Sequence, residues 1–598
     1  MKRTRKSKVS IAPTGTQSDT KEKNSQTAQL PPIALPAFLS AIALWASFAP
    51  LGLSLVAWVA PMGWLVVIER DTSPGKRGYF WLYLSGFLFW MLNLQGIRLA
   101  FWALIFGWIA LSVYLAIYVP LFVGVTRTLR FAWRWPLFIA APVTWVGLEV
   151  ARSFIITGYA ASLLGHTQAH QPIVIQIADQ LGGYGVSFLI MAVNVAVFQI
   201  VTSLRHAKLT DLESKESQPK AALVPALFAL TLLLASLGYG WWRLKQADQL
   251  ASTSKPLLRV ALLQENTPTI FDSNTERIAV AWARYLDLTR EAAQQHGVAD
   301  LVVWPESTFT NLLPWTEVNI TNGVPQDLLK RDNTITEEQL AYGKQKSAAE
   351  FKIKLDRVLA AARNESVMQP PATPIRDRPY LLLGCDALTI TSQSMEQFNS
   401  AIFFDPAGTY QDRYDKMHLV MFGEYIPLGP VLQFLADAFQ VGSIQAGKDV
   451  KCFDIAGTMV APNICFESML PELVSWQIRK LIAENRAPDV LINVTNDSWF
   501  WGSSILDHHL ACSIFCAVEN RRPFLVAANT GLSAEIDGSG RVLQVSQRLT
   551  KTALLAEPRA DGRRGMVQTV GYPLAWLCCA IVAAAIIVSF AKKLSRPR

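Results

Sequence analysis

The sequence predicts a polytopic α-helical membrane domain of about eight spans, into which an α/β sandwich domain is inserted. Hydrophobic residues make up 51% of the 598 residues and charged residues only 17%, a balance that indicates membrane spans beside a water-soluble part. Seven long apolar runs lie before residue 244 and one lies after residue 566. Between them, short β-branched runs alternate with helical patterns, which is typical of a layered α/β domain.

Residues 1–30 are polar and basic, and we expect them to form a cytoplasmic tail without a packed core. The apolar stretch that follows is expected to be a first span rather than a secretory signal, because its polar leader is long and more apolar runs come after it. Runs close to the ~20 residues that cross the hydrocarbon core mark the spans. We expect them at 33–49, 52–69, 79–97, 100–126, 136–156, 183–204, 222–243 and 567–591. The first seven belong to a membrane domain over residues 31–243.

The basic residues predict the orientation of these spans. Lys and Arg gather in the segments 70–78, 127–135 and 205–221 and in the tail of the last span, 567–598, as the positive-inside rule places them in cytoplasmic loops. Only Arg98 and Arg152 lie at positions that this topology places outside the cytoplasm. Because the net charge of +9 is distributed in this way, it indicates a membrane protein and no nucleic-acid partner. The long segment 244–566 is then expected outside the cytoplasm.

The segment 244–566 is expected to be one α/β domain. Its strands are expected at 257–264, 300–306, 380–386, 400–408, 458–467, 489–497 and 524–531, where β-branched runs are bounded by turn residues. Residues 277–297 have a helical pattern that ends on a glycine, a common helix stop. Residues 312–375 are more polar, and we expect a solvated insertion there that carries one amphipathic helix.

Three apolar strands of this domain are followed by an ionisable residue, and these residues form a possible set for covalent catalysis. Glu306 follows LVVWP, Lys416 follows the strand in SAIFFDPAG and its turn, and Cys465 follows TMVAPNI. Loops at strand ends hold reactive groups on a rigid scaffold. A thiolate can act as the nucleophile, a carboxylate can accept its proton, and an ammonium can stabilise an oxyanion. The residues alone leave the alternative open that Cys465 is an ordinary buried thiol.

The motifs around these residues carry a resemblance to a known family. WPES (304–307), YDKMHLVMFGEYIPL (414–428) and NICFES (463–468) occur in the order found in the nitrilase, or carbon–nitrogen hydrolase, superfamily, which implies an αββα sandwich. With seven expected spans before the domain and one after it, the chain resembles the apolipoprotein N-acyltransferases. Further segments with this resemblance are RSFIITGY (152–159), LGGYGVSFL (181–189), NDSWF (496–500), AVENRRPF (517–524) and NTGLSAEIDGSGRV (529–542).

The resemblance implies a role for each candidate residue. Glu306 is the general base, Lys416 the cation that stabilises the oxyanion, and Cys465 the nucleophile that carries the acyl group. Glu424 and Glu467 match accessory positions of the active site, with a hydrogen-bonding role in the fold as the alternative. Phe466 also stands beside the nucleophile, where the family often has Tyr.

Two further departures from the family pattern lie outside this set. Phe271 is near a position where the family has Trp, so the aromatic character is kept at that position as it is at Phe466. The polar insertion between the expected base and the expected cation is also longer than in the family. Some change in the contacts to acyl chains or other parts of the substrates is expected from the two aromatic exchanges at Phe271 and Phe466.

Other ionisable residues are weaker candidates for a site. Asp507, His508 and His509 are consecutive, so their side chains point in different directions and a shared metal ion is not expected. Cys512 and Cys516 lie one helical turn apart and are expected to pack on a helix face. Glu149 and Arg152 close the fifth expected span, where both a functional role and an interfacial ion pair remain open.

The resemblance implies a membrane acyltransferase of the bacterial inner membrane with its catalytic domain on the periplasmic side. The expected partners are a phospholipid acyl donor such as phosphatidylethanolamine, apolipoproteins with a diacylglyceryl-modified N-terminal cysteine, and the lipid bilayer. No cofactor and no metal are expected. The alternatives are a membrane-tethered amidase of the nitrilase type that acts on a soluble amide, and a membrane scaffold whose hydrolase domain has lost activity.

Overall fold

The computed structural model describes residues 32–594, apart from short gaps. The gaps are 100–101, 103, 157, 210–217, 269–274, 310–313, 320–323, 326–327, 330–333, 369–371, 422 and 426–443. The expected tail at residues 1–30 and Phe271 therefore lie outside the described residues.

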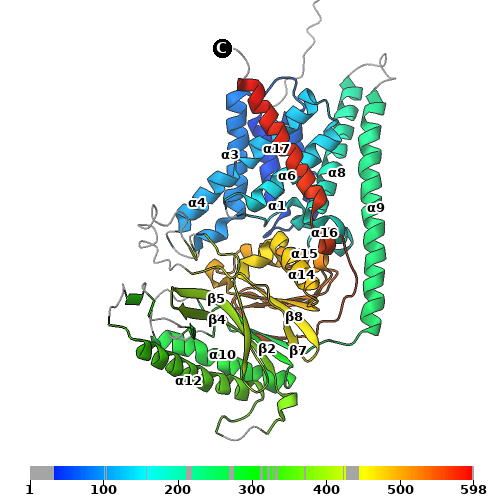
Figure 1. Cartoon of the computed structure of the whole chain (residues 1–598). Helices are drawn as coiled ribbons and strands as arrows, with labels where there is room; N and C mark the ends of the chain where they lie inside the picture. Colours follow the sequence, from blue (N-terminus) through cyan, green and yellow to red (C-terminus); the bar gives the residue numbers. More distant parts are fainter. Residues whose placement is uncertain are drawn as a thin grey trace, which may run out of the picture.

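Apolar helices form one end of the molecule and the two β-sheets form the other (Figure 1). The helices are α1 (Ala34–Ser47), α2 (Met62–Ile68), α3 (Gly75–Asn93), α4 (Leu104–Leu115), α5 (Tyr118–Arg127), α6 (Leu137–Phe154), α8 (Ala178–Leu209), α9 (Gln218–Thr253) and α17 (Pro573–Leu594). Helix α17 ends at the far end of this helical part, away from the sheets. We call these helices the helical part. Residues 254–566, which contain the motifs that resemble the carbon–nitrogen hydrolases, are called the hydrolase part.

Five helical stretches among the described residues are long and apolar enough to cross a membrane. They are Leu104–Ala132, Leu137–Phe154, Ala178–Arg205, Ala222–Thr253 and Pro573–Lys592. Length and composition thus identify five of the eight expected spans as candidates.

The other three expected spans coincide with shorter or more polar helices. Helix α1 has only 14 residues. The expected span 52–69 is divided into a 3-10 helix, η1 (Ser54–Trp58), and the seven-residue α2, with Pro61 before α2. Helix α3 has 19 residues but starts with Gly75, Lys76 and Arg77, which lowers its apolar character. Periodicity and hydropathy alone did not show these interruptions.

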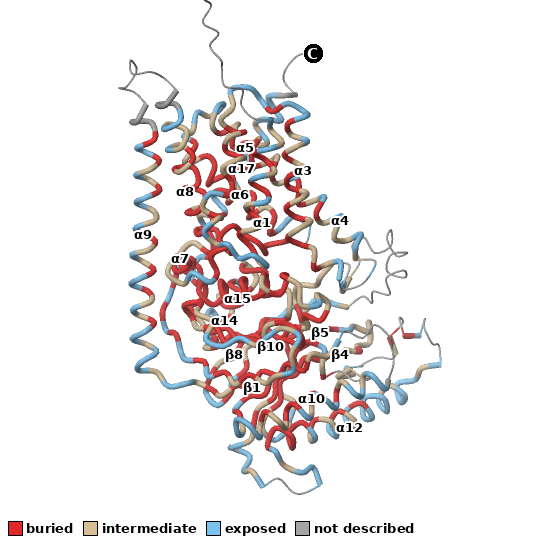
Figure 2. Tube along the Cα trace, turned by 180° about the vertical axis from the view of Figure 1, so that it is seen from behind, coloured by how far each residue is buried: buried red, intermediate tan, exposed pale blue. Residues whose placement is uncertain are grey.

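Helix α9 connects the two parts of the molecule. Its 36 residues correspond to about 54 Å at 1.5 Å per residue, whereas the hydrocarbon core is about 30 Å thick. The helix runs beside the other helices and continues down to the sheets (Figure 1), and much of its surface is exposed along its length (Figure 2). It therefore supplies both a candidate span and the connection to the hydrolase part.

The hydrolase part contains two sheets. The first has the strand order β13-β1-β2-β4-β5-β6, with β3 paired to β4, and the second has the order β12-β11-β10-β9-β8-β7. Their bounds are β1 Val260–Gln264, β2 Leu301–Trp304, β3 Trp315–Asn319, β4 Tyr380–Thr391, β5 Met395–Phe404, β6 Tyr410–Asp415, β7 Phe453–Ile455, β8 Thr458–Ile464, β9 Val490–Thr495, β10 Phe524–Ala528, β11 Ala534–Ile536, β12 Val542–Val545 and β13 Thr552–Ala556. All seven expected strands are present.

Buried side chains from both sheets form a common core, and helices cover the two outer faces. Leu262, Val303, Val460 and Ile492 belong to the core between the sheets. Helices α10 (Thr275–His296) and α12 (Glu337–Ala362) cover the first sheet, whereas α14 (Pro471–Ala483) and α15 (Ile505–Asn520) cover the second. This is the expected αββα sandwich.

The amphipathic helix expected within residues 312–375 is α12. Its N-terminus has a capping box formed by Thr336 and Gln339. Phe351, Leu355 and Val358 in its second half are buried in the core on the outer face of the first sheet. This half of α12 is thus part of the sandwich, and the more solvated residues lie around its first half.

Buried charged groups join the hydrolase part to the helical part. Arg521, which follows α15 and is fully buried, donates from Nε to Asp179 Oδ2 of α8 at 2.8 Å. Glu519 of α15 accepts a hydrogen bond from Gly183 N of α8 at 2.7 Å and another from Tyr572 Oη at 2.7 Å. Because Tyr572 precedes α17, these contacts fix α15 to two helices that are far apart in the sequence.

Glu519→Gln should change how stability depends on pH. Burial raises the pKa of Glu519 from 4.5 to about 8, so the stability that its protonated form contributes is complete below pH 4.5 and is lost as the pH rises through about 8. Glutamine mimics the protonated form. We expect the melting temperature of detergent-purified protein to fall less between these pH values in Glu519→Gln than in the wild type. The exposed Glu338→Gln on α12 is the control, and equal pH slopes for all three proteins would contradict this account.

Candidate active site

Three of the predicted residues converge at one edge of the sandwich. Glu306 lies two residues after β2 and Lys416 directly after β6, both in the first sheet, whereas Cys465 directly follows β8 in the second sheet. Lys416 Nζ is 3.1 Å from Glu306 Oε1. The charges of Glu306 and Lys416 both act on the thiol of Cys465. The structure therefore brings together residues separated by 110 and 49 positions, that is 416 − 306 and 465 − 416.

Lys416 is a buried cation between two carboxylates. Its Nζ donates to Glu306 Oε1 at 3.1 Å and to Glu424 Oε1 at 2.8 Å, and the residue is only 1% exposed. Burial alone would lower the pKa of Lys416, but the charges of Glu306 and Glu424 outweigh burial and raise it well above its ordinary value. Lys416 is thus held as an ammonium.

Glu306 is held by donors from both sheets. Asn399 of β5 donates from Nδ2 to Glu306 Oε1 at 2.7 Å, and Asn496 N, after β9, donates to Oε2 at 2.9 Å. Gly384 of β4 permits this position, because a Cβ there would lie 2.1 Å from Pro305 O and 2.6 Å from Glu306 Cα. These contacts therefore fix the position of the Glu306 carboxylate, whose charge acts on the thiol of Cys465.

Cys465 begins a short turn, η6 (Cys465–Met469), which we call the Cys465 turn. Its φ is +52°, a left-handed conformation that costs a residue with a Cβ about 1 kcal/mol or more. Burial and the charge of Glu306 raise the pKa of the Cys465 thiol well above its ordinary value, although Lys416 opposes this shift. The resting thiol is consequently protonated, and its reaction as a nucleophile requires a base.

Glu467 fastens the Cys465 turn to the segment that carries Lys416. Its Oε2 accepts from Ile464 N at 2.7 Å, and its Oε1 accepts from Met417 N at 2.7 Å and from His418 N at 3.1 Å. Tyr414 Oη also donates to this carboxylate at 2.8 and 2.9 Å. Glu467 is thus a positioning residue, which is the alternative that the sequence left open for it.

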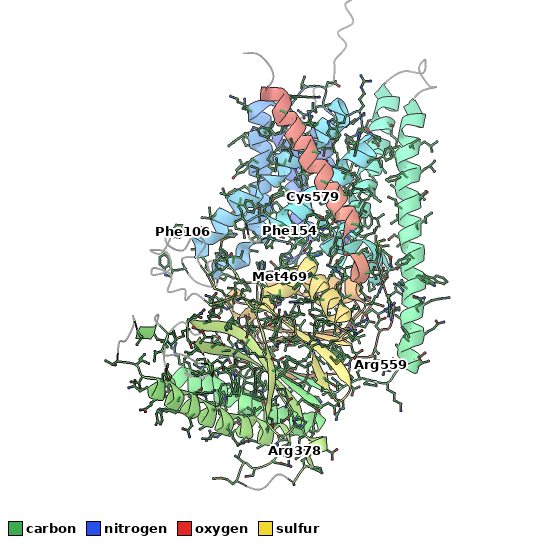
Figure 3. All side chains as sticks on the ribbon, viewed as in Figure 1. Phe106, Phe154, Arg378, Met469, Arg559 and Cys579 are labelled. Atoms are coloured by element: carbon green, nitrogen blue, oxygen red, sulfur yellow. The ribbon has the colours of Figure 1, made fainter. Side chains whose placement is uncertain are left out.

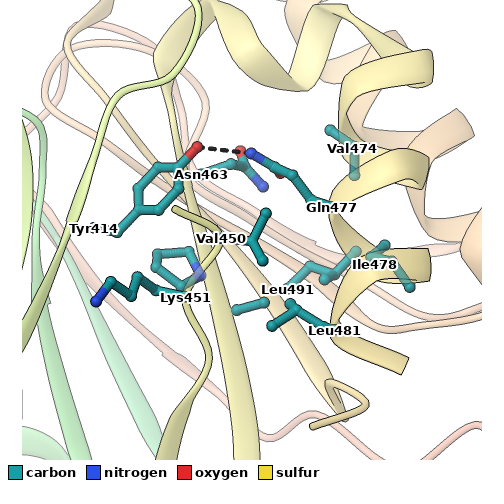
Figure 4. Close-up of a pocket in the computed structure, with 11 residues that line it drawn as sticks. Tyr414, Val450, Lys451, Asn463, Val474, Gln477, Ile478, Leu481 and Leu491 are labelled. Carbon is teal, nitrogen blue, oxygen red and sulfur yellow. Dashed lines mark hydrogen bonds between the residues drawn. The ribbon is translucent and has the colours of Figure 1, made fainter. Parts of the chain in front are cut away.

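A small apolar pocket between α14 and strands β8 and β9 shows how Tyr414 is oriented (Figure 4). Gln477 of α14 donates from Nε2 to Tyr414 Oη at 2.7 Å, so the hydroxyl hydrogen is left to point at Glu467. Val450, Ile478 and Leu491 line the same pocket. The pocket is part of the packing between helix α14 and strands β8 and β9.

The two other accessory residues occupy different positions. Glu424 contacts Lys416 directly and also accepts from Val420 N at 2.8 Å through Oε2. The ring of Phe466 lies against the ring of His418, with centroids 5.9 Å apart. Glu424 therefore belongs to the charged cluster, whereas Phe466 packs against the segment that follows Lys416.

The candidate site lies on the side of the sheets that faces the helices. Figure 3 shows Met469, the last residue of the Cys465 turn, at this boundary, and Arg378 at the opposite end of the molecule. The ring of His508 in α15 lies 5.7 Å from that of Phe48, just after α1. The Cys465 turn is thus placed close to the helical part.

Phe48 also lines an apolar cavity within the helical part, together with Trp64, Trp90 and Phe122. Glu149 and Arg152 reach the same cavity. Trp145 Nε1 and Leu164 N both donate to Glu149 Oε1, at 2.9 and 2.7 Å. Arg152 donates from Nη2 to Ala161 O at 3.2 Å. Glu149 and Arg152 therefore bind backbone groups of the segment that follows α6.

The side chains of His508 and His509 point in different directions, as their adjacent positions predict. His508 faces Phe48, whereas His509 lies under the Cys465 turn, with Nε2 3.2 Å from Cys465 O. In the part of the chain that the structure describes, no group of three or more His, Cys, Asp or Glu is placed to hold a metal ion. Cys512 and Cys516 are buried in α15.

Sequence reasoning missed Asn399, Asn496 and the position of His509. Asn399 is a polar residue inside the apolar strand FNSAIFF, and Asn496 follows the buried strand LINVT. The signal that could have identified both was a polar residue in or directly after an apolar strand that neighbours the strands before Glu306 and Cys465. His509 was considered only as a metal ligand.

Two family models match the chain. One, described as apolipoprotein N-acyltransferase N-terminal domain, matches residues 40–196, and the other, carbon–nitrogen hydrolase, matches residues 259–562. An apolipoprotein N-acyltransferase of Rhodopirellula baltica is 32% identical over 547 residues, covering 89% of this chain and 92% of that protein. One of Geobacter metallireducens is 30% identical over 567 residues, covering 94% and 95%.

Among solved structures, the Saccharomyces cerevisiae protein Nit3 of the nitrilase superfamily is 14% identical with a TM-score of 0.33, covering 51% of this chain and 90% of that chain. An amidase from Nesterenkonia sp. is also 14% identical with a TM-score of 0.32, covering 54% and 97%.

Glu467→Gln should weaken the Cys465 turn. A glutamine side chain must direct its amide hydrogens at backbone N–H groups that now donate to the carboxylate, and each unsatisfied buried group costs about 1–3 kcal/mol. We expect a lower melting temperature and a slower reaction of Cys465 with an alkylating reagent. The exposed Glu484→Gln should change neither, and an unchanged alkylation rate in Glu467→Gln would contradict the positioning role.

Proposed function

The chain belongs to the apolipoprotein N-acyltransferase family, and we propose that it transfers an acyl chain from a phospholipid to the N-terminal amine of diacylglyceryl-modified apolipoproteins, with Glu306, Lys416 and Cys465 as the catalytic residues. The single observation that carries this assignment is the buried Lys416–Glu306 contact of 3.1 Å beside a thiol at a strained turn. Such an arrangement suits covalent acyl transfer. The chain is a bacterial membrane protein by its family and its apolar helices.

In the first half-reaction, Glu306 accepts the thiol proton while Cys465 Sγ attacks the ester carbonyl of the phospholipid. Lys416 lies within hydrogen-bonding distance of Glu306 and stabilises the oxyanion that forms. The intermediate collapses with cleavage of the ester bond, and Glu306 returns the proton to the leaving alkoxide. The products are a lysophospholipid and an acyl thioester on Cys465.

In the second half-reaction, the free α-amine of the apolipoprotein attacks the thioester carbonyl. Glu306 accepts a proton from the attacking nitrogen and returns it to the sulfur as the C–S bond breaks. The products are an N-acylated lipoprotein and the free thiol. Because the donor leaves before the acceptor reacts, the mechanism is of the ping-pong type.

The apolar helices suit substrates that carry acyl chains. Burial of each CH₂ group contributes about 0.8 kcal/mol, so moving either lipid substrate into water would cost many times this value. The boundary position of Met469 and the nearby cavity lined by Phe48 and Trp64 support an approach of both lipids from the membrane. Phosphatidylethanolamine is the proposed donor.

The membrane-tethered amidase is the less favoured function. It would use the same three residues on a soluble amide, but it gives no role to the apolar helices beside the site. The named relatives also match over about nine-tenths of their length, which includes these helices. A scaffold that has lost activity is not favoured either, since all three residues are present.

We also propose the topology predicted by the basic residues, with eight spans in the bacterial inner membrane and the hydrolase part in the periplasm. The short α1, the interrupted η1–α2 segment and α3 would complete the count. The end of α17 lies at the far side of the helical part from the sheets, which supports this arrangement.

Purified enzyme mixed with phospholipid alone should accumulate an acyl group on Cys465, because the thioester forms before any amine is needed. Intact-protein mass spectrometry would show the added mass. Cys465→Ala should abolish it, whereas Cys512→Ala and Cys578→Ala should leave it nearly intact. Comparable loss in either control would mean that the nucleophile is misassigned.

The acceptor can be tested on the same acyl-enzyme. A diacylglyceryl-modified peptide with a free N-terminal amine should discharge the thioester, and its acetylated form should not, because an amide nitrogen is a poor nucleophile. An active sample that never carries the acyl mass, yet releases ammonia from a soluble amide, would favour the amidase.

A reporter fused after residue 20 and another after residue 560 should lie on opposite sides of the membrane, since seven spans separate the tail from the end of the hydrolase part. Reporters active only in the cytoplasm or only in the periplasm make the measurement. Detection of both fusions on one side would rule out the proposed topology.

A further inference from the structure

His509 of α15 lies directly behind the nucleophile and contacts three polar groups. Its Nδ1 is 3.3 Å from Asp497 Oδ1, its Nε2 is 2.6 Å from Ser468 Oγ, and the same Nε2 is 3.2 Å from Cys465 O. Asp497 belongs to the short helix η7 (Asp497–Phe500) after β9. All of these side chains are buried, so water does not replace the contacts.

The partners determine which ring nitrogens of His509 carry hydrogen. The carbonyl oxygen of Cys465 can only accept, so a hydrogen bond from Nε2 requires a hydrogen there. Asp497 Oδ1 accepts from Thr495 Oγ1 at 3.0 Å, as a carboxylate does, so Nδ1 must also carry a hydrogen to donate to it. A ring with hydrogen on both nitrogens is an imidazolium.

The position of Asp497 is built into the fold. A Cβ at Gly531 would lie 2.2 Å from Asp497 Oδ2, so only glycine leaves room for the carboxylate at this place. The carboxylate is therefore packed under the turn, where it can compensate a buried positive charge.

Other charged or titratable groups near His509 favour the charged ring or face elsewhere. Burial alone would lower the pKa of His509, but the charges of Asp497 and Glu306 and the Cys465 carbonyl outweigh it and raise the pKa. On the same helix, Asp507 pairs with Arg548 at 2.7 Å.

The neighbouring histidine behaves in the opposite way. His508 packs against Phe48, and burial lowers its pKa to about 4. Cys512, one turn further along α15, has its Sγ 3.7 Å from His166 Nδ1. The two adjacent histidines of this helix thus occupy environments that favour different charge states.

We propose that His509 is a positioning residue held as an imidazolium, and that its Nε2–H together with the Ser468 hydroxyl holds the carbonyl of Cys465 so that the strained nucleophile turn is set for acylation. The carbonyl accepts from Ser468 Oγ at 3.2 Å and from Asn493 Nδ2 at 3.1 Å as well. The functional half of this inference rests on the proposed role of Cys465.

Loss of the proton would release the carbonyl. A neutral ring that keeps hydrogen on Nδ1 for Asp497 would present a lone pair at Nε2, and this lone pair would attract the Ser468 hydroxyl at 2.6 Å. Both Ser468 and His509 would then cease to donate to Cys465 O, and Asn493 alone would remain. The carbonyl of Cys465, a residue in the left-handed conformation at φ +52°, would lose two of its three hydrogen-bond donors.

The charge state can be measured without an activity assay. The chain has only seven histidines, so nitrogen NMR of the full-length protein with isotope-labelled histidine in detergent can resolve their rings. The signal of His509 is the one lost in His509→Gln, and at neutral pH it should show hydrogen on both nitrogens. Asp497→Asn should convert this signal to a neutral ring, and His508→Gln should leave it unchanged. A neutral His509 in the wild type would overturn the proposal.

The functional consequence is tested by the rate at which Cys465 is acylated by phospholipid. Loss of a charge-assisted hydrogen bond should slow acylation about tenfold or more in His509→Gln and Asp497→Asn, with little change in KM. The ratio of the Asp497→Asn rate to the wild-type rate should rise as the pH is lowered, because acid restores the imidazolium. His508→Gln should behave as the wild type.

The two measurements separate the possible failures. If His509→Gln does not fold, Asp497→Asn identifies the ring signal by its shift and carries the rate test. A ratio that does not depend on pH, or a wild-type acylation rate in Asp497→Asn, would overturn the positioning role. Absence of any acyl-enzyme in the wild type would instead contradict the proposed function, and the NMR result would still decide the charge state of His509.

Discussion

The charge cluster of Lys416, Glu306 and Glu424 is the interaction on which the rest of the site depends. Lys416 and Glu306 are buried and Glu424 is partly buried, so removal of Lys416 would leave the buried carboxylate of Glu306 without a compensating charge, at a cost of about 3–5 kcal/mol. Lys416 is 1% exposed and contacts both carboxylates. In the proposed reaction, a proton moves from Cys465 to Glu306, so the total charge of the site stays constant while negative charge moves to the sulfur and then to the oxyanion. Lys416 offsets that charge at each stage, because its two carboxylate partners hold it in the charged form.

The site forms because strands of two separate sheets end at the same edge of the sandwich. Glu306 and Lys416 follow β2 and β6 of the first sheet, whereas Cys465 and Asn496 follow β8 and β9 of the second. Glu467 joins the two sides, since it accepts from Ile464 N beside the nucleophile and from Met417 N beside the cation. Both oxygens of the Glu467 carboxylate accept hydrogen bonds, and these bonds fix the spacing between Lys416 and Cys465. The packed core between the sheets resists any sliding of one sheet over the other.

The sequence allowed the sandwich and the three central residues to be predicted, but it left out much of their support. Strands that are apolar on both faces, such as β9 and β10, stood out as runs, whereas β6 (YQDRYD) and β12 (VLQV) are too polar or too short to be recognised by hydropathy. Lys416 was consequently assigned to the end of the wrong strand, although the structure still places it beside Glu306. Asn399, Asn496 and His509 act through contacts across 93, 190 and 44 positions, and periodicity contains no information about such pairings. Similarly, α1 and η1–α2 were expected as full spans because apolar composition alone does not reveal where a helix is interrupted.

The boundary between the two parts of the molecule explains why a hydrolase fold is combined with apolar helices. A charged cluster in contact with lipid would be expensive, yet acyl chains lifted into water would be expensive as well. The fold separates the two requirements: Lys416 and Glu306 are buried in protein, and the Cys465 turn lies on the side of the sheets that faces the helices. Arg521 and Glu519 fasten α15 to α8, and the same helix carries His509 under the nucleophile. Helix α15, which anchors the hydrolase part to the helical part, therefore also supports the Cys465 turn. The same helix thus sets both the position of Cys465 relative to the helices and the geometry of its turn.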